Sequence, residues 1–194
     1  MEPDTITPEQ AEELLAALNE QLGTRGARYE IVVIGGAALG VLGLVRRPTR
    51  DVDVVALHDG LALVPADPLP EALQEAVRRV AADFGLAETW LNAEPADLAR
   101  WGLPDGFEER MVSRGYGPAL TVHYAARLDQ IHFKLFAMAD QGVGRHEDDL
   151  RALGPSPEEL LAAARWTRTH DPSEGFRQQL LAVLRYLGIP DADD

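Results

Sequence analysis

The hydrophobic pattern divides the chain into a mixed first part and a helical last part. Residues 7–23 begin with a capping box and continue with leucines at helical spacing, which predicts a helix. Residues 29–34 are an apolar, β-branched run that indicates a buried strand. Residues 37–45 are apolar all round, as in a helix deep inside a domain, and residues 51–57 indicate a second strand.

The later pattern becomes predominantly helical. Short strands are expected at 86–91 and 119–124, and helices at 71–84, at 127–140, from 145, from 156 and at 177–187. Residues 58–70 indicate a loop, and residues 92–118 give no clear order. We therefore predict an α/β (α+β) fold, with one domain over residues 1–154 and a helical extension over residues 155–194 that ends in an acidic tail.

The stretch between the first two strands carries the strongest candidate for chemistry. Gly35-Gly36 ends the first strand, and Asp51 and Asp53 stand two residues apart on the second, so their carboxylates share a face. Two like charges among apolar residues are unfavourable unless a cation neutralises them, and oxygen ligands suit Mg²⁺ or Mn²⁺. Two plainer interpretations stay open, namely a tight glycine turn and solvated acids on an exposed strand face.

Composition narrows the class of protein. The 194 residues are 46% hydrophobic and 26% charged and include no cysteine, which fits an ordinary soluble domain and excludes disulfides and thiolate zinc sites. No apolar run approaches the roughly 20 residues of a membrane helix. We therefore expect a cytoplasmic protein with no membrane partner. The net charge of −14 argues against broad, nonspecific binding to nucleic acid.

The basic residues are unevenly chosen, because Lys134 is the single lysine beside 17 arginines. It lies within an apolar helical pattern, where a lysine often extends its ammonium to water. The alternative is a functional point charge, since an ammonium differs chemically from a planar guanidinium when it meets phosphate. The histidines at positions 123, 132 and 146 fall on different predicted elements and indicate no metal site.

Two blocks of sequence resemble the nucleotidyltransferase superfamily with the DNA-polymerase-β-like fold. The first is Ile34-Gly35-Gly36, a helix, and then Arg47-Pro48-Thr49-Arg50-Asp51-Val52-Asp53. The second is Lys134-Leu135-Phe136-Ala137 followed by Arg145-His146-Glu147-Asp148-Asp149-Leu150. Together they are most similar to the bacterial abortive-infection toxins of type IV toxin–antitoxin systems and to their uncharacterised relatives, over roughly residues 30–153.

This resemblance implies a mixed sheet flanked by helices and a metal-dependent transfer of an NMP group from a nucleoside triphosphate to a hydroxyl acceptor. It implies that Asp51 and Asp53 hold Mg²⁺ or Mn²⁺ and act in catalysis together with Lys134 and Asp149. The nucleotide would contact Lys134 and four further residues: Gly35, Gly36, Arg47 and Arg50. The acceptor would be a tRNA end or a protein, and a cognate antitoxin would be a further partner.

The chain departs from the superfamily at the third carboxylate. Many members have one on a later strand, whereas residues 120–124 contain none and Glu88 is a weak candidate. Asp149 has three open interpretations: it orients Lys134, binds substrate, or caps a helix. The rival hypothesis is a catalytically degenerate nucleotidyltransferase fold that binds a nucleotide or a protein. The triplet Trp90-Leu91-Asn92 also resembles the relatives, but no mechanism follows from it.

Overall fold

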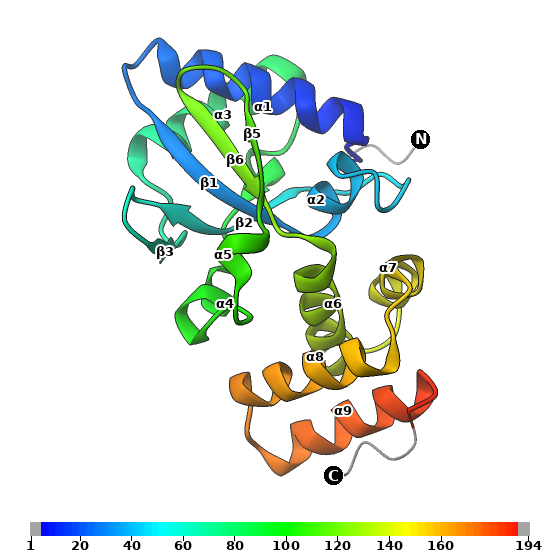
Figure 1. Ribbon diagram of the computed structural model, residues 1–194. Helices are drawn as coiled ribbons and strands as arrows, with labels where there is room; N and C mark the ends of the chain where they lie inside the picture. The colour runs from blue at the N-terminus through cyan, green and yellow to red at the C-terminus, as the bar shows by residue number, and fades with distance from the viewer. Residues whose placement is uncertain (1–4, 190–194) are drawn as a thin grey trace. The chain divides into compact units, whose positions relative to one another are not determined.

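A computed structural model describes residues 5–189 of the chain and divides it into two compact units (Figure 1). Unit 1 comprises Met1–Leu103 and Glu108–Ala125, and unit 2 comprises Pro104–Phe107 and Ala126–Asp194. The predicted α/β fold, a mixed sheet with flanking helices followed by a helical part, is confirmed. The domain boundary expected after residue 154 stays a prediction.

Unit 1 is built around a mixed β-sheet. Its strands follow the spatial order β3-β2-β1-β6-β5, and the short β4 pairs with β2. The strands are β1 (Tyr29–Ile34), β2 (Val52–His58), β3 (Leu63–Pro65), β4 (Leu91–Asn92), β5 (Val112–Gly115) and β6 (Leu120–Tyr124). The helical segments are α1 (Pro8–Gly23), α2 (Gly35–Val41), α3 (Glu71–Phe84), the 3₁₀ segment η1 (Glu88–Trp90), α4 (Ala96–Trp101) and α5 (Phe107–Arg110), of which α5 crosses the boundary of the units.

The two faces of the sheet differ in character. One face packs against α1 and α3, and its buried side chains include Ile31, Val33, Val54 and Val122. The opposite face carries Glu30 from β1, since successive side chains alternate between faces. We call this second surface the polar face.

A bulge in β2 sets which residues reach the polar face. The pairing of β1 with β2 runs Val32↔Ala56 and then Val33↔Val54, so Val55 is an extra residue that has no pairing partner on β1. An extra residue shifts the alternation of a strand by one position. Asp53 pairs with Ile34 and Leu57 with Ile31, which places Asp53 and His58 on the polar face although their sequence separation is odd.

Several elements differ from the sequence prediction at their boundaries. The helix expected at 37–45 begins at Gly35 and ends at Val41, because the chain turns after it toward Thr49. The strand expected at 86–91 is mostly η1, which buries Trp90 and lets its indole N–H donate to Val77 O at 3.1 Å. The loop expected at 58–70 contains β3.

Between residues 126 and 189, unit 2 consists of four helices. They are α6 (Arg127–Gln141), α7 (Arg145–Leu153), α8 (Pro157–His170) and α9 (Glu174–Tyr186). Aromatic rings from three of these helices form its interior, with ring centroids of Phe133 and Phe136 at 5.6 and 6.2 Å from that of Trp166 and Phe176 at 5.8 Å from Phe136. Within the described residues, no helix is long and apolar enough to span a membrane.

Candidate functional site

The glycine turn after β1 lies directly against the carboxylate of Asp53. Gly35 has a φ of +72°, and a Cβ atom placed on it would come within 2.7 Å of Asp53 Oδ2. A side chain at this position would therefore be strained and would also collide with the carboxylate. The pairing of Ile34 with Asp53 across β1 and β2 produces this closeness. The two predicted motifs thus meet in space.

The second glycine, Gly36, leaves space for the segment that leads into β2. A Cβ on Gly36 would lie 2.5 Å from Thr49 Oγ1 and 3.9 Å from Arg47 Nη2. Thr49 is held in place by two backbone bonds with Ile6, Ile6 N to Thr49 O at 2.7 Å and Thr49 N to Ile6 O at 2.9 Å. Arg47 and Thr49 of the first motif therefore lie directly beside the glycine turn.

Asn92 is the residue that the sequence reasoning did not assign. Short β4 runs parallel to β2 and pairs Asn92 with Asp53, and the Asn92 Nδ2 group donates to Asp53 Oδ1 at 3.4 Å. Asn92 Oδ1 accepts from Glu94 N at 2.9 Å, which fixes the amide. The triplet Trp90-Leu91-Asn92 was the signal available in the sequence, but only the strand pairing shows that its last member orients an acid.

Asp51 occupies a different local environment from Asp53. It precedes β2, is half-buried, and lines a pocket of about 240 Å³ together with Arg50, Thr89 and Trp90. Arg50 itself is exposed, and the Arg47 guanidinium donates to Pro48 O at 3.0 Å. Both arginines thus lie in the segment that joins the glycine turn to the acids.

In unit 2, the single lysine forms a buried ion pair. Lys134 on α6 and Asp149 on α7 approach to 2.8 Å between Nζ and Oδ2, with side chains only 7% and 0% exposed. The interpretation that Lys134 extends to water is therefore wrong. Asp149 does not cap α7, whose N-cap is Gly144. The pairing fits the interpretation that Asp149 orients Lys134.

The carboxylate of Asp53 is the side chain best placed to meet a cation that arrives with its substrate. Among residues 5–189, no group of three or more His, Cys, Asp or Glu side chains is placed to hold a metal ion. Mg²⁺ is commonly bound through one or two carboxylates together with substrate phosphates. Asp53, kept in position by Gly35 and Asn92, and the neighbouring Asp51 match that requirement; both assignments remain predictions.

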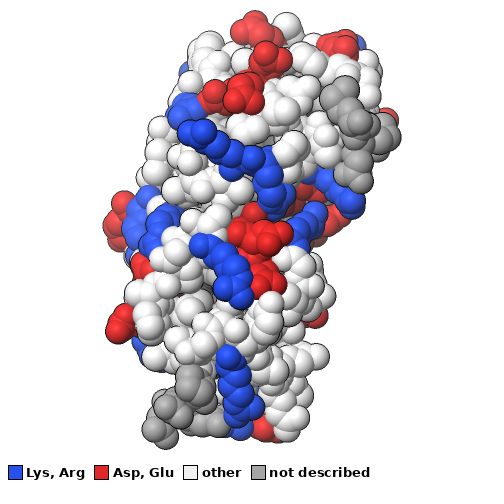
Figure 2. All heavy atoms as spheres, turned by 90° about the vertical axis from the view of Figure 1, so that its right-hand side faces the viewer, with Lys and Arg blue, Asp and Glu red and all other residues white. Residues whose placement is uncertain are grey.

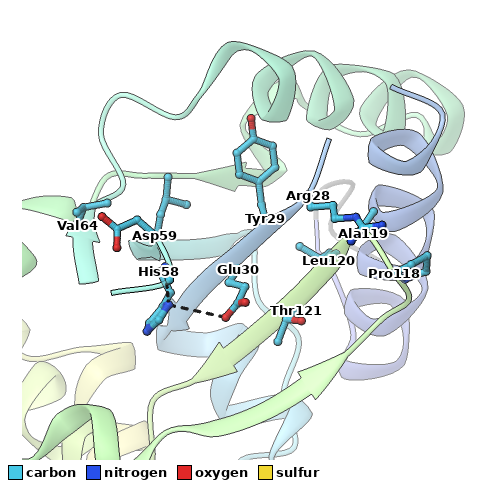
Figure 3. Close-up of a pocket in the computed structure, with 12 residues that line it drawn as sticks. Arg28, Tyr29, Glu30, His58, Asp59, Val64, Pro118, Ala119, Leu120 and Thr121 are labelled. Atoms are coloured by element: carbon cyan, nitrogen blue, oxygen red, sulfur yellow. Dashed lines mark hydrogen bonds and ion pairs between the residues drawn. The ribbon is translucent and has the colours of Figure 1, made fainter. Parts of the chain in front are cut away.

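The remaining polar features of the chain lie elsewhere. His132 Nδ1 lies 2.8 Å from Leu128 O and His146 Nε2 lies 3.1 Å from Gln141 Oε1, so each has a local partner. A pocket of about 550 Å³ lies at the end of the sheet where β1 and β6 begin (Figure 3). The glycine turn follows the opposite end of β1. Its lining includes Glu30, His58 and Asp59.

Comparison with known proteins gives a single result. A search of curated proteins found no match, and a search of solved structures found none. A family described as "Nucleotidyltransferase of unknown function" (DUF6036) matches residues 12–145, which is more than half of the chain. The match includes the glycine turn, Asp51, Asp53, Asn92 and Lys134. The chain therefore belongs to this family of nucleotidyltransferases of unknown function.

Proposed function

We propose that the chain is a metal-dependent nucleotidyltransferase that moves an NMP group from a nucleoside triphosphate to a hydroxyl acceptor. The observation that carries this proposal is the contact between the glycine turn and Asp53, which leaves 2.7 Å between the Cβ position of Gly35 and Asp53 Oδ2. A glycine turn at the start of a helix lets backbone N–H groups approach phosphate, and the adjacent carboxylate suits the cation that accompanies it.

Each side chain then has a defined task. Asp51 and Asp53 would hold Mg²⁺ or Mn²⁺, and the cation would supply stabilisation of the charge that develops on the leaving pyrophosphate. Gly35 and Gly36 admit the phosphates, and Arg47 and Arg50 lie along the segment beside them. The acceptor oxygen forms the new bond to the α-phosphorus as the bond to pyrophosphate breaks.

Lys134 and Asp149 form the second part of the proposal. A buried lysine held by a carboxylate at 2.8 Å has a fixed direction, which suits a group that must meet phosphate at one position. Lys134 would contact the nucleotide, and Asp149 would orient Lys134. The Lys134 side chain is 7% exposed, so a ligand would reach only a small part of it.

The nature of the acceptor is the finer part of the proposal. By resemblance to the abortive-infection toxins, the acceptor hydroxyl belongs to a tRNA end or to a protein, and a cognate antitoxin would control the chain. The net charge of −14 and the mixing of acidic with basic side chains on the surface drawn in Figure 2 favour an acceptor with a small contact area.

A catalytically degenerate binding module is the second candidate, favoured by the absence of a third carboxylate at the site within residues 5–189.

The test uses the protein with Mg²⁺, each α-labelled nucleoside triphosphate and cell extract. An active enzyme transfers label to an RNA or protein band; Asp53→Asn abolishes the transfer, while Asp105→Asn, at an exposed position, retains it. Equal labelling by Asp53→Asn and wild type would falsify the assignment of Asp53, and saturable nucleotide binding without transfer would support the binding module.

A further inference from the structure

Three side chains on the polar face form a continuous chain of hydrogen bonds across three strands. Ser113 Oγ on β5 lies 2.7 Å from His123 Nδ1 on β6. His123 Nε2 lies 3.0 Å from Glu30 Oε2 on β1. A hydroxyl, an imidazole and a carboxylate are thus connected in that order. We call these residues the relay.

The register of the sheet explains why the three groups meet. Ser113 pairs with His123 in the antiparallel β5–β6 ladder. Tyr116 N donates to Leu120 O at 2.9 Å, so alternation along the ladder makes Ser113 and His123 a pair without backbone hydrogen bonds between them. Such pairs bring their side chains closest together, and the backbone N–H of Ser113 points to the outer edge of the sheet.

A second imidazole lies near the acid of the relay, although its Nδ1 accepts from Gly60 N at 3.1 Å and donates no hydrogen bond to Glu30. His58 Nδ1 on β2 lies 3.9 Å from the same oxygen, Glu30 Oε2, and Figure 3 shows the two side chains directed toward each other. The His123 side chain is 12% exposed, whereas Ser113 is exposed. The imidazole is therefore mostly enclosed and oriented, while Ser113, which it contacts, is an exposed residue.

We propose that the relay is a second reactive centre, in which Ser113 is a nucleophile toward small carboxylic esters. Ser113 Oγ bonds to the carbonyl carbon as its proton passes to His123, and Glu30 stabilises the imidazolium. The ester C–O bond breaks, and the leaving oxygen takes the proton from His123. Water then hydrolyses the acyl-serine with His123 again as base. The outward N–H of Ser113 is a donor for the oxyanion.

This centre is independent of the proposed nucleotidyl transfer. Asp53 stands on β2 and Ser113 on β5, with β1 and β6 between them. At about 4.8 Å between neighbouring strands, the two backbones are roughly 14 Å apart across the sheet. Asp53→Asn therefore removes nucleotidyl transfer and leaves the reaction of Ser113 unchanged.

The experiment incubates the full chain with p-nitrophenyl acetate and follows two quantities, the burst of p-nitrophenol and the acetylated residue by peptide mass spectrometry. The expected result is a burst of about one equivalent with acetyl on Ser113. Ser113→Ala abolishes it, and Ser113→Cys, whose thiol replaces the hydroxyl, restores acylation. His123→Gln slows the burst by about 100-fold or more, the range of a general base, and Glu30→Gln slows it by a smaller factor.

Thr121→Ala is the matched control, because it removes a hydroxyl group on β6 that has no part in the relay. The burst of this variant is expected to equal that of wild type. Thermal unfolding establishes that each variant is folded. An unchanged burst in Ser113→Ala or in His123→Gln overturns the proposal, as does acetyl found only on residues other than Ser113.

Discussion

At the scale of single residues, close contacts with two neighbouring residues position the carboxylate of Asp53. Gly35 meets one carboxylate oxygen and Asn92 meets the other, so the direction of Asp53 depends on both. Each neighbour can be changed separately, and each change has a distinct expected result.

The first prediction concerns the space beside Asp53. Gly35→Ala adds a Cβ at a φ of +72° and 2.7 Å from Asp53 Oδ2, so both backbone strain and collision destabilise the fold. The control is Gly60→Ala, with a φ of +93° and no atom within 4 Å of its Cβ position. We expect the control to lose about 1–2 kcal/mol of unfolding free energy and Gly35→Ala to lose more, as measured by urea unfolding. Equal losses would show that Asp53 gives way freely.

The second prediction concerns the neighbour on β4. Asn92→Asp places a second carboxylate beside Asp53, which destabilises the chain without divalent cation and stabilises it with one. We expect a lower melting temperature than wild type in chelator, and a larger rise than wild type when Mn²⁺ is added. Asn92→Ala is the control, since it removes the amide without adding charge. Identical Mn²⁺ responses of the three proteins would rule out a cation beside Asp53.

The third prediction concerns the ion pair of unit 2. Lys134→Met leaves the fully buried Asp149 without its ammonium partner, and such a change costs about 3–5 kcal/mol. Replacing both residues, as Lys134→Met with Asp149→Leu, removes the buried charge and is expected to cost clearly less than the sum of the two single changes. Urea unfolding of the two single variants and the double variant measures the coupling. Asp148→Asn, on the exposed side of α7, is expected to be neutral.

At the scale of elements, Arg127 connects the helices of unit 2. From the start of α6, its guanidinium donates to Leu153 O at 2.8 Å, to Gly154 O at 2.8 Å, and to both oxygens of Glu159 at 2.7 and 3.0 Å. Glu159 also accepts from Ser156 N at 2.9 Å as part of the capping box of α8. One arginine thus links the end of α7 to the beginning of α8.

The fourth prediction follows from that contact. The Arg127 bond, together with the bond from Ser156, holds the pKa of Glu159 below its ordinary value of 4.5. A carboxyl with a lowered folded-state pKa contributes stability above its unfolded pKa and loses it as pH falls through the folded value. Between about pH 5 and pH 3, wild type is expected to lose more unfolding free energy than Glu159→Gln. Parallel pH curves for the two proteins would show that the contact contributes nothing.

The elements also show what the sequence could and could not predict. Capping boxes at Thr7 and Ser156 predicted two helix starts, because the signals are local. The meeting of Gly35 with Asp53 was predictable from strand order. The contacts of Asn92 and Ser113 were not, since they depend on which strands pair and in what register, and no short-range pattern encodes that. The structural role of Trp90 was not predicted, because η1 depends on the contacts of its indole ring and not on the spacing of residues in the sequence.

At the scale of the whole molecule, charge limits the kind of partner. The net charge is −14, and basic side chains are interspersed with acidic ones over the face in Figure 2. The three arginines between the glycine turn and the acids come from one segment, 46–50. A nucleic-acid acceptor would therefore meet few cations at once.

The fifth prediction is a shallow salt dependence of acceptor binding. Two or three phosphate contacts give a slope of about −2 in a plot of log affinity against log salt for a single-stranded end. Filter binding of bulk tRNA between 50 and 200 mM salt, roughly the range over which such slopes are measured, provides the value. A slope near −6 would require a large basic surface and would contradict an acceptor held only at its end.

The extra residue in β2 has a consequence for the whole polar face. Without Val55, Asp53 and His58 would fall out of phase, and one of them would turn toward the hydrophobic core. The position of Asp53 beside the glycine turn and the position of His58 near Glu30 thus depend on the same extra residue. A one-residue deletion in β2 would therefore turn either Asp53 or His58 away from the polar face, with an effect comparable to replacing that side chain.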